Sequence, residues 1–190
     1  METNSFFDYE YYIDWNIIPA YDNLSTGEKK KAQKQFETYR KYLNSWNDKD
    51  IIEFIDEDTQ FGDHLESLLS QEYSETIACF AVDKSNKPIG VIILESARNK
   101  NINLEFAVID KKHRNKGLGT RMLKSLQENI QEFVGGRKIN GINTLIRSDN
   151  SRSIKAFTNS NFVYKPGDAS YANYKLFYCN LRELNEDHNM

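Results

Sequence analysis

The stretch that decides the fold is Arg114-Asn115-Lys116-Gly117-Leu118-Gly119-Thr120. It connects an apolar run with the character of a strand, 102–109, to an amphipathic run with the character of a helix, 118–133. The first N–H groups of a helix have no partners inside the helix, and the helix dipole places partial positive charge there. Glycine in the turn lets a ligand approach the backbone closely. The stretch therefore predicts a site for a phosphate-bearing ligand at the start of the helix.

Around this turn, hydrophobic periodicity predicts the order strand, two helices, three strands, helix, strand, helix, two strands. The predicted strands are 11–21, 76–82, 89–95, 102–109, 142–146, 161–164 and 174–181. The predicted helices begin at a capping box formed by Ser25 and Glu28, near Leu65, at Leu118 and at Ser151. The acidic stretch 48–58 has no clear period and is left unassigned.

A strand–helix–strand unit around the glycine turn implies that the sheet is partly parallel there. We therefore expect an α/β fold, with a mixed central sheet of about seven strands flanked by helices. No linker, repeat or low-complexity block interrupts the chain, so we expect a single domain over 1–190 with a polar tail at 183–190. Within 102–109, Leu104, Phe106 and Val108 are expected on one face of the strand, and Asn103, Glu105 and Ala107 on the other.

The composition is that of a globular domain, since 39% of the 190 residues are hydrophobic and 28% are charged. A formal net charge of −3 argues against general nucleic-acid binding and is compatible with a cationic substrate. The two cysteines, Cys79 and Cys179, are interpreted as buried, reduced thiols. Because the three histidines are scattered and no C-x-x-C pair is present, no metal site is expected.

The N-terminus shows no secretory signal, and the longest strongly apolar stretch, 89–94, is too short to span a membrane. We therefore expect a cytoplasmic protein that binds neither a membrane nor a nucleic acid.

Two motif blocks and a strand carry a resemblance to a known family. The blocks are Arg114-x-x-Gly117-x-Gly119 and Asn150-x-x-Ser153-x-x-x-Phe157-x-x-x-Asn161-Phe162, and the strand carries Pro88-Ile89-Gly90-Val91. In these motifs, their spacing and their flanking elements, the chain resembles the GNAT-type N-acetyltransferases, which bind acetyl-CoA. The resemblance covers about 76–181, the expected core of the domain. The first 75 residues match only in outline and are expected to shape the acceptor site with a strand and helices.

The resemblance implies acetyl-CoA as cosubstrate and no metal. The backbone of 115–120 would cradle the pyrophosphate, and the end of the strand at 107–109 would contact the pantetheine. A splay between this strand and the one that begins near Ile142 would open the slot for the pantetheine. The implied cofactor-binding residues are Ala107, Val108, Ile109, Arg114, Asn115, Lys116, Gly117, Leu118, Gly119, Thr120, Asn150, Ser153 and Phe157.

The implied reaction is direct attack by a primary amine of a small molecule or a peptide on the thioester. Such an amine has a pKa of roughly 10 and is mostly protonated at neutral pH, so a base must accept its proton. Glu105, just before the cofactor-contacting segment, is the candidate catalytic base, and Glu95 on the preceding strand is the second choice. The resemblance does not identify the acceptor, and it leaves both a monomer and a homodimer open.

The chain departs from the family at two positions. Many members carry Tyr where this chain has Phe157, and some carry Glu where it has Leu145. Phe157 has no proton to give to the leaving thiolate, so Tyr164, Tyr171 or Tyr174 would have to serve if an acid is needed. These departures disfavour the branch of the family that acetylates peptide N-termini.

Two other functions remain open at this point. The departures at Phe157 and Leu145 motivate a catalytically weak, regulatory module that binds acyl-CoA. The glycine turn alone would also suit an α/β protein that binds another nucleotide, although neither the Walker A pattern nor G-x-G-x-x-G is present.

Overall fold

The structure is a computed structural model that describes residues 13–20, 24–46, 60–69, 75–96, 100–166 and 173–182. Four features of the sequence analysis lie outside these residues. They are the ends of the predicted first strand at 11–12 and 21, the unassigned stretch 48–58, Tyr171 and the tail 183–190.

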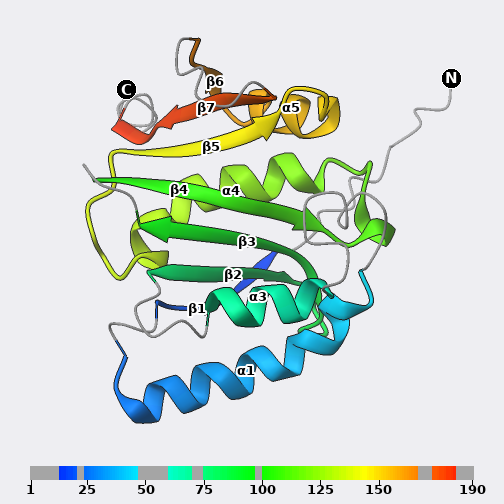
Figure 1. The fold of residues 1–190 in the computed structure, drawn as a ribbon, viewed down its shortest axis with the longest axis vertical. Helices are drawn as coiled ribbons and strands as arrows, with labels where there is room; N and C mark the ends of the chain where they lie inside the picture. Colours follow the sequence, from blue (N-terminus) through cyan, green and yellow to red (C-terminus); the bar gives the residue numbers. More distant parts are fainter. Residues whose placement is uncertain are drawn as a thin grey trace, which may run out of the picture.

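Within the described residues, seven strands form one sheet in the order β1-β2-β3-β4-β5-β7-β6 (Figure 1). The strands are β1 Asp14–Ile18, β2 Thr76–Val82, β3 Pro88–Ser96, β4 Asn101–Ile109, β5 Gly141–Arg147, β6 Val163–Tyr164 and β7 Tyr174–Asn180. Every neighbouring pair is antiparallel except β4 and β5, which are parallel. The predicted mixed, partly parallel sheet is therefore confirmed.

Three of the four described helices begin where the sequence predicts them, and the short helix predicted near Leu65 begins at Phe61. The described helices are α1 Thr26–Asn44, α3 Phe61–Leu69, α4 Leu118–Phe133 and α5 Ser151–Thr158. At the start of α1, Ser25 and Glu28 form the predicted capping box, in which each side chain bonds to the backbone of the other. None of the described helices is long and apolar enough to cross a membrane.

The sheet is covered on both faces along β2 and β3. On one face α1 and α3 pack with Phe36, Leu43 and Phe61, and on the other α4 packs with Met122 and Leu126 (Figure 1). All residues of β2 are buried, which explains why this strand is an unbroken apolar run rather than an alternating one. Both cysteines, Cys79 and Cys179, lie buried, and burial raises the pKa of Cys79.

The expected alternation along β4 is wrong beyond Leu104. Leu104 packs in the core under α4, whereas Phe106 and Val108 pack against the core under α1 and α3. The cause is a shift in register, because Leu94 of β3 pairs with Leu104 but the preceding Ile93 pairs with Phe106. Glu105 is thus an extra residue in β4, a bulge that exchanges the two faces of the strand.

A candidate acyl-CoA and acceptor site

The turn between β4 and α4 is tied to the end of β4. It contains a short 3-10 helix, η3 Lys111–His113, which is capped by the side chain of Asp110 through the N–H of Lys112 at 3.2 Å. The guanidinium Nε of Arg114 donates to the carbonyl oxygen of Ile109 at 2.8 Å. This bond folds the turn back on the last residue of the strand and fixes where α4 can begin.

Helix α4 begins without a side-chain cap. Its N-cap is Gly117, which has a φ of +74° and makes no capping side-chain bond. Asn115, two residues earlier, also lies in the left-handed region with a φ of +61°. The first-turn N–H groups of α4 have no partners within the helix, so the predicted phosphate site has the expected backbone geometry.

Gly119 lets three elements meet at this turn. A Cβ at Gly119 would lie 3.3 Å from Cδ1 of Ile109 on β4 and 3.8 Å from Cβ of Ala156 on α5. The first of these distances is tighter than most Cβ contacts, so Cδ1 of Ile109 would have to move by a few tenths of an ångström to admit a Cβ at this position. The glycine turn, the end of β4 and α5 are therefore neighbours, although α5 is distant in the sequence.

The second motif block forms the start of α5. Asn150 is the N-cap of this helix, and its Oδ1 accepts a hydrogen bond from the N–H of Ser153 at 3.1 Å. Phe157 lies in the core with 5% of its surface exposed and meets Phe162 edge-on, with 4.9 Å between ring centroids. Asn161, where the motif usually has glycine, takes a left-handed φ of +63°. Asparagine tolerates this conformation better than most residues, so the turn is preserved.

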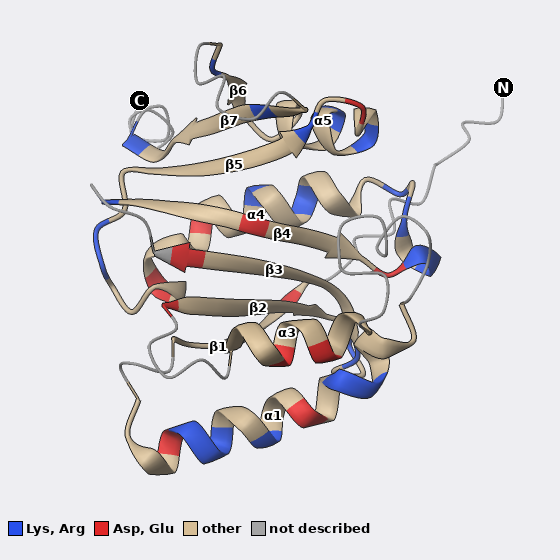
Figure 2. Ribbon diagram, in the orientation of Figure 1, with Lys and Arg blue, Asp and Glu red and all other residues tan. Residues whose placement is uncertain are grey.

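Basic residues gather around these helix starts. Figure 2 shows Lys and Arg on η3, at the start of α4 and on α5, while acidic residues lie at the far end of α4. The residues concerned are Lys111, Lys112, Arg114, Lys116, Arg121, Arg152 and Lys155. Positive charge at a helix N-terminus opposes the helix dipole, and an anionic ligand would offset that conflict.

Strands β4 and β5 part after a short ladder. Pairing runs from Asn101 with Gly141 to Asn103 with Asn143 and goes no further along these two strands. The last link is the hydroxyl of Thr144, which donates to the carbonyl oxygen of Leu104 at 2.9 Å. From Glu105 to Ile109, the edge of β4 that faces β5 pairs with none of the described strands. The predicted splay is thus present beside Ala107, Val108 and Ile109.

Glu105 lies on the bulge at the start of this splay. Because Leu94 faces α4, Glu95 lies on the opposite face of β3. The carboxyl of Glu105 is close enough for the charge of Glu95 to act on its pKa, so Glu105 projects toward the same face. Glu105 is exposed along part of its side chain, and partial desolvation by its neighbours raises the pKa of its carboxyl. The charge of Glu95 raises this pKa further. A carboxylate with a raised pKa is a better proton acceptor, as a base for an ammonium group requires.

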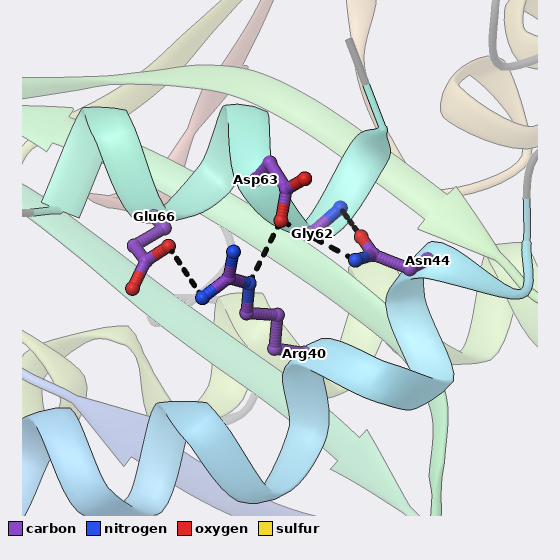
Figure 3. A network of polar contacts seen from close by, with 5 residues as sticks. All are labelled: Arg40, Asn44, Gly62, Asp63 and Glu66. Carbon is purple, nitrogen blue, oxygen red and sulfur yellow. Dashed lines mark hydrogen bonds and ion pairs between the residues drawn. The ribbon is translucent and has the colours of Figure 1, made fainter.

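Helix α3 borders the same face and is fixed to α1 by a polar network (Figure 3). Arg40 on α1 bonds to Asp63 at 2.7 Å and to Glu66 at 3.0 Å. The N–H of Gly62 donates to Oδ1 of Asn44 at 2.8 Å. A Cβ at Gly62 would lie only 2.8 Å from the carbonyl oxygen of Arg40, so the two helices approach each other only because this residue is glycine.

The sequence analysis gave no role to His64, which this packing brings toward β4. The imidazole of His64 on α3 meets the ring of Phe106 edge-on, with 5.7 Å between centroids. Phe106 directly follows Glu105, so α3 borders the strand segment that carries the candidate base. A single histidine on a short amphipathic helix carries no sequence signal that would have revealed this position.

The tyrosines considered as alternative acids are on the far strands. Tyr164 on β6 and Tyr174 on β7 are 47% and 45% exposed, and Tyr164 packs on Phe177. Across the described residues, no group of three His, Cys, Asp or Glu side chains could hold a metal ion.

The comparisons with known proteins agree with this geometry. A family model described as "Acetyltransferase (GNAT) family" matches residues 33–162. No curated protein matches the sequence.

Solved structures share the fold at low sequence identity. The aminoglycoside acetyltransferase AAC(6′)-Ib in complex with coenzyme A and kanamycin is 16% identical, with a TM-score of 0.64 over 80% of this chain and 95% of that one. The N-acetyltransferase PseH of Campylobacter jejuni is 14% identical, with a TM-score of 0.53 over 88% of this chain and 97% of that one. A GNAT-family acetyltransferase of Staphylococcus aureus Mu50 is 20% identical, with a TM-score of 0.53 over 88% and 99%. These likenesses confirm the predicted fold.

Proposed function

The chain belongs to the acetyltransferase (GNAT) family and is an acyltransferase, and we propose that it transfers the acetyl group of acetyl-CoA to a primary amine of a small molecule or a peptide. The observation that carries the proposal is the uncapped start of α4 at Gly117, which follows the end of β4 where β4 and β5 no longer pair. The uncapped start of α4 suits a pyrophosphate, and the edge of β4 that no longer pairs with β5 can bond to a pantetheine arm.

The cofactor side of the site is proposed as follows. The N–H groups of 115–120 hold the pyrophosphate, with Arg114 and Lys116 adding positive charge. The edge of β4 at 107–109 bonds to the pantetheine along the splay. Asn150 and Ser153 border the cofactor from the start of α5, and Phe157 contributes a core ring near the thioester. The coenzyme A in the AAC(6′)-Ib structure supports this choice of cosubstrate.

The reaction needs a base more than it needs an acid. Glu105 accepts a proton from the bound ammonium group, the neutral nitrogen then forms a bond to the acetyl carbon, and the carbon–sulfur bond breaks. The second proton that the nitrogen loses passes to the departing thiolate, directly or through water. A strand N–H at the splay stabilises the oxyanion that develops. A thiol has a pKa of about 8.5, so the thiolate leaves without a strong proton donor, which is compatible with Phe157 in place of a tyrosine. Tyr164 and Tyr174 stay alternative proton donors.

We further propose that 1–190 is one domain in which the first 75 residues shape the acceptor side. The packing of α1 and α3 on the face that carries Glu105 supports this division. The small-molecule amine in the AAC(6′)-Ib complex, kanamycin, supports a small-molecule acceptor.

A second candidate function is a regulatory module that binds acyl-CoA and turns over slowly. It is favoured by Phe157, which is buried and has no hydroxyl, and by Leu145, which has no carboxylate.

One experiment separates these functions. Thermal stability of the full chain is measured with acetyl-CoA, desulfo-CoA, ATP and NAD, followed by acetyl transfer to a panel of amines. We expect the CoA compounds alone to stabilise the protein and at least one amine to be acetylated. Stabilisation without transfer to any amine would favour the regulatory module. No stabilisation by acetyl-CoA would contradict both functions.

A further inference from the structure

Leu145 lies directly across the splay from the candidate base. Asn103 pairs with Asn143, and the hydroxyl of Thr144 bonds to the carbonyl of Leu104. Counting one residue onward along each parallel strand places Leu145 level with Glu105. These two residues are therefore the first pair on either side of the opening.

Leu145 also shares a face with Glu105. Its neighbours Ile142 and Ile146 pack in the core under α4, and Thr144 is buried, so Leu145 points to the opposite face. That is the face on which Glu95 and Glu105 lie. Helices α1 and α3 cover β1 to β3 on this face and lie away from β5 (Figure 1). Leu145 is accordingly 45% exposed, although it lies in the middle of a strand.

The exposed leucine is part of a larger apolar surface. Leu176 on β7 pairs directly with Leu145, and Tyr178 pairs with Asn143 one row away on the same face. The ring of Tyr178 lies over Gly141, where a Cβ would collide with it. The ammonium of Lys165 lies 3.8 Å from the centroid of this ring. Leu145, Leu176 and Tyr178 form what we call the apolar strip, and Tyr178 is held in place by these contacts.

Charge is divided across the opening. Among the described strand residues of this face, the acidic Glu95 and Glu105 belong to β3 and β4. The basic residues Lys165 and Arg147 flank the apolar strip, and Arg147 is paired with Asp149 at 3.0 Å. A single ammonium group is favoured at Glu105, whereas a second cation placed over the strip would meet leucine and positive charge.

We infer that the acceptor is a primary amine with an aromatic or branched aliphatic group, which packs on the apolar strip while its nitrogen lies at Glu105. This inference rests on the proposed function and names the substrate class for the same site. Each methylene group buried against the strip raises affinity about fourfold. A polyamine or a polyhydroxylated amine would instead lose hydration over the leucines without gaining partners.

The test compares amines of increasing apolar size under saturating acetyl-CoA. The series is ethylamine, 3-methylbutylamine and 2-phenylethylamine, with spermidine and kanamycin as polycationic acceptors. We expect kcat/KM for 2-phenylethylamine to exceed that for ethylamine by about tenfold or more. A flat series, or faster transfer to spermidine or kanamycin, would overturn this inference and leave the proposed function intact.

Variants of Leu145 test whether the apolar strip causes the preference for the larger apolar amine. We expect Leu145→Ser to raise KM for 2-phenylethylamine about tenfold, to change KM for ethylamine less than about twofold, and to leave kcat nearly unchanged. Leu145→Met should retain the wild-type preference for 2-phenylethylamine over ethylamine. That result would show that the apolar surface at this position, and not leucine itself, sets the preference. Val163→Ser is the comparison variant. Val163 is 67% exposed on the edge strand β6 and pairs with Tyr178 at the end of the strip away from Leu145, so this change should raise KM for 2-phenylethylamine much less than Leu145→Ser does. An equal effect of Leu145→Ser on both amines would contradict the inference. If acetyl-CoA stabilises the protein but no amine is acetylated, both the inference and amine transfer are wrong.

Discussion

The proposed cofactor side and the proposed acceptor side of the site are built in different ways. The cofactor side is largely one continuous segment, from the end of β4 through η3 to the first turn of α4, with α5 added beside it. The acceptor side takes Glu105 from β4, Leu145 from β5, Leu176 from β7 and His64 from α3. The proposed phosphate site therefore depends mainly on local sequence, whereas the proposed acceptor surface depends on how distant strands and helices meet.

The largest effect is expected where the two sides join. Glu105→Gln removes the proposed proton acceptor and should lower kcat/KM for any accepted amine about a hundredfold or more. The thermal shift produced by acetyl-CoA should stay the same, because the cofactor side is untouched. Steady-state kinetics and thermal shifts measured on the same preparation check both statements. Near wild-type kcat/KM would exclude Glu105 as the base.

The next effect tests the cofactor side alone. Gly117→Ala places a Cβ at a φ of +74° at the start of α4, and Gly135→Ala does so at a φ of +68° just after the helix ends. Neither new Cβ would meet another atom within 4 Å, so both variants should lose about 1 kcal/mol from backbone strain alone.

Only Gly117→Ala should also weaken acetyl-CoA binding, by about fivefold or more, because only that residue borders the proposed phosphate site. Binding is measured by titration calorimetry and stability by denaturant unfolding. Equal acetyl-CoA affinity in both variants would remove Gly117 from the cofactor site.

A smaller effect, a shift in the pH dependence of kcat/KM, tests whether Glu95 acts on Glu105. The raised pKa of Glu105 means that its base form is lost on acidification at a higher pH than for an ordinary glutamate. The pH at which kcat/KM falls on acidification should therefore lie above 4.5, the ordinary pKa of a glutamate side chain. Glu95→Gln removes a like charge, lowers the pKa of Glu105 and should move this fall to lower pH without abolishing activity. A pH profile of both proteins with one amine measures the shift, and an unchanged profile would show that Glu95 does not act on Glu105.

The smallest effect concerns the α1–α3 network of Figure 3. Arg40→Met removes the bonds to Asp63 and Glu66, and since these side chains are partly exposed we expect only a small fall in Tm near neutral pH. Arg40 lowers the pKa of Asp63, so the contribution of the pair is present above the ordinary value of 3.8 and is lost as pH falls through the lowered value.

The Tm difference between the wild type and Arg40→Met should accordingly shrink in acid. Arg147→Met, which breaks a pair within one loop, serves as the control and should not alter the packing of α3 on α1. A difference in Tm that does not depend on pH would show that the aliphatic part of Arg40, not its charge, holds the helices together.

Most of the fold could be predicted from the sequence because its signals are local. The capping box at Ser25 and Glu28, the apolar run of β2 and the amphipathic pattern of α4 each need only neighbouring residues to be recognised. The strand predicted at 161–164 is shorter in the structure, β6 Val163–Tyr164, because Phe162 still bonds to Phe157 of the preceding helix. Strand ends depend on such competing bonds, which periodicity does not reveal.

The sequence by itself determined the glycine turn, the helix that follows it and the family to which the chain belongs. These depend on backbone conformation and hydrogen bonding within a few residues. Only the tertiary structure decided that Glu105 lies on a bulge, that Phe106 and Leu104 face opposite cores, and that Leu145 lies across the opening from the proposed base. Each of these depends on register between strands, and a register shift of one residue exchanges the faces of a strand without changing its amino-acid pattern.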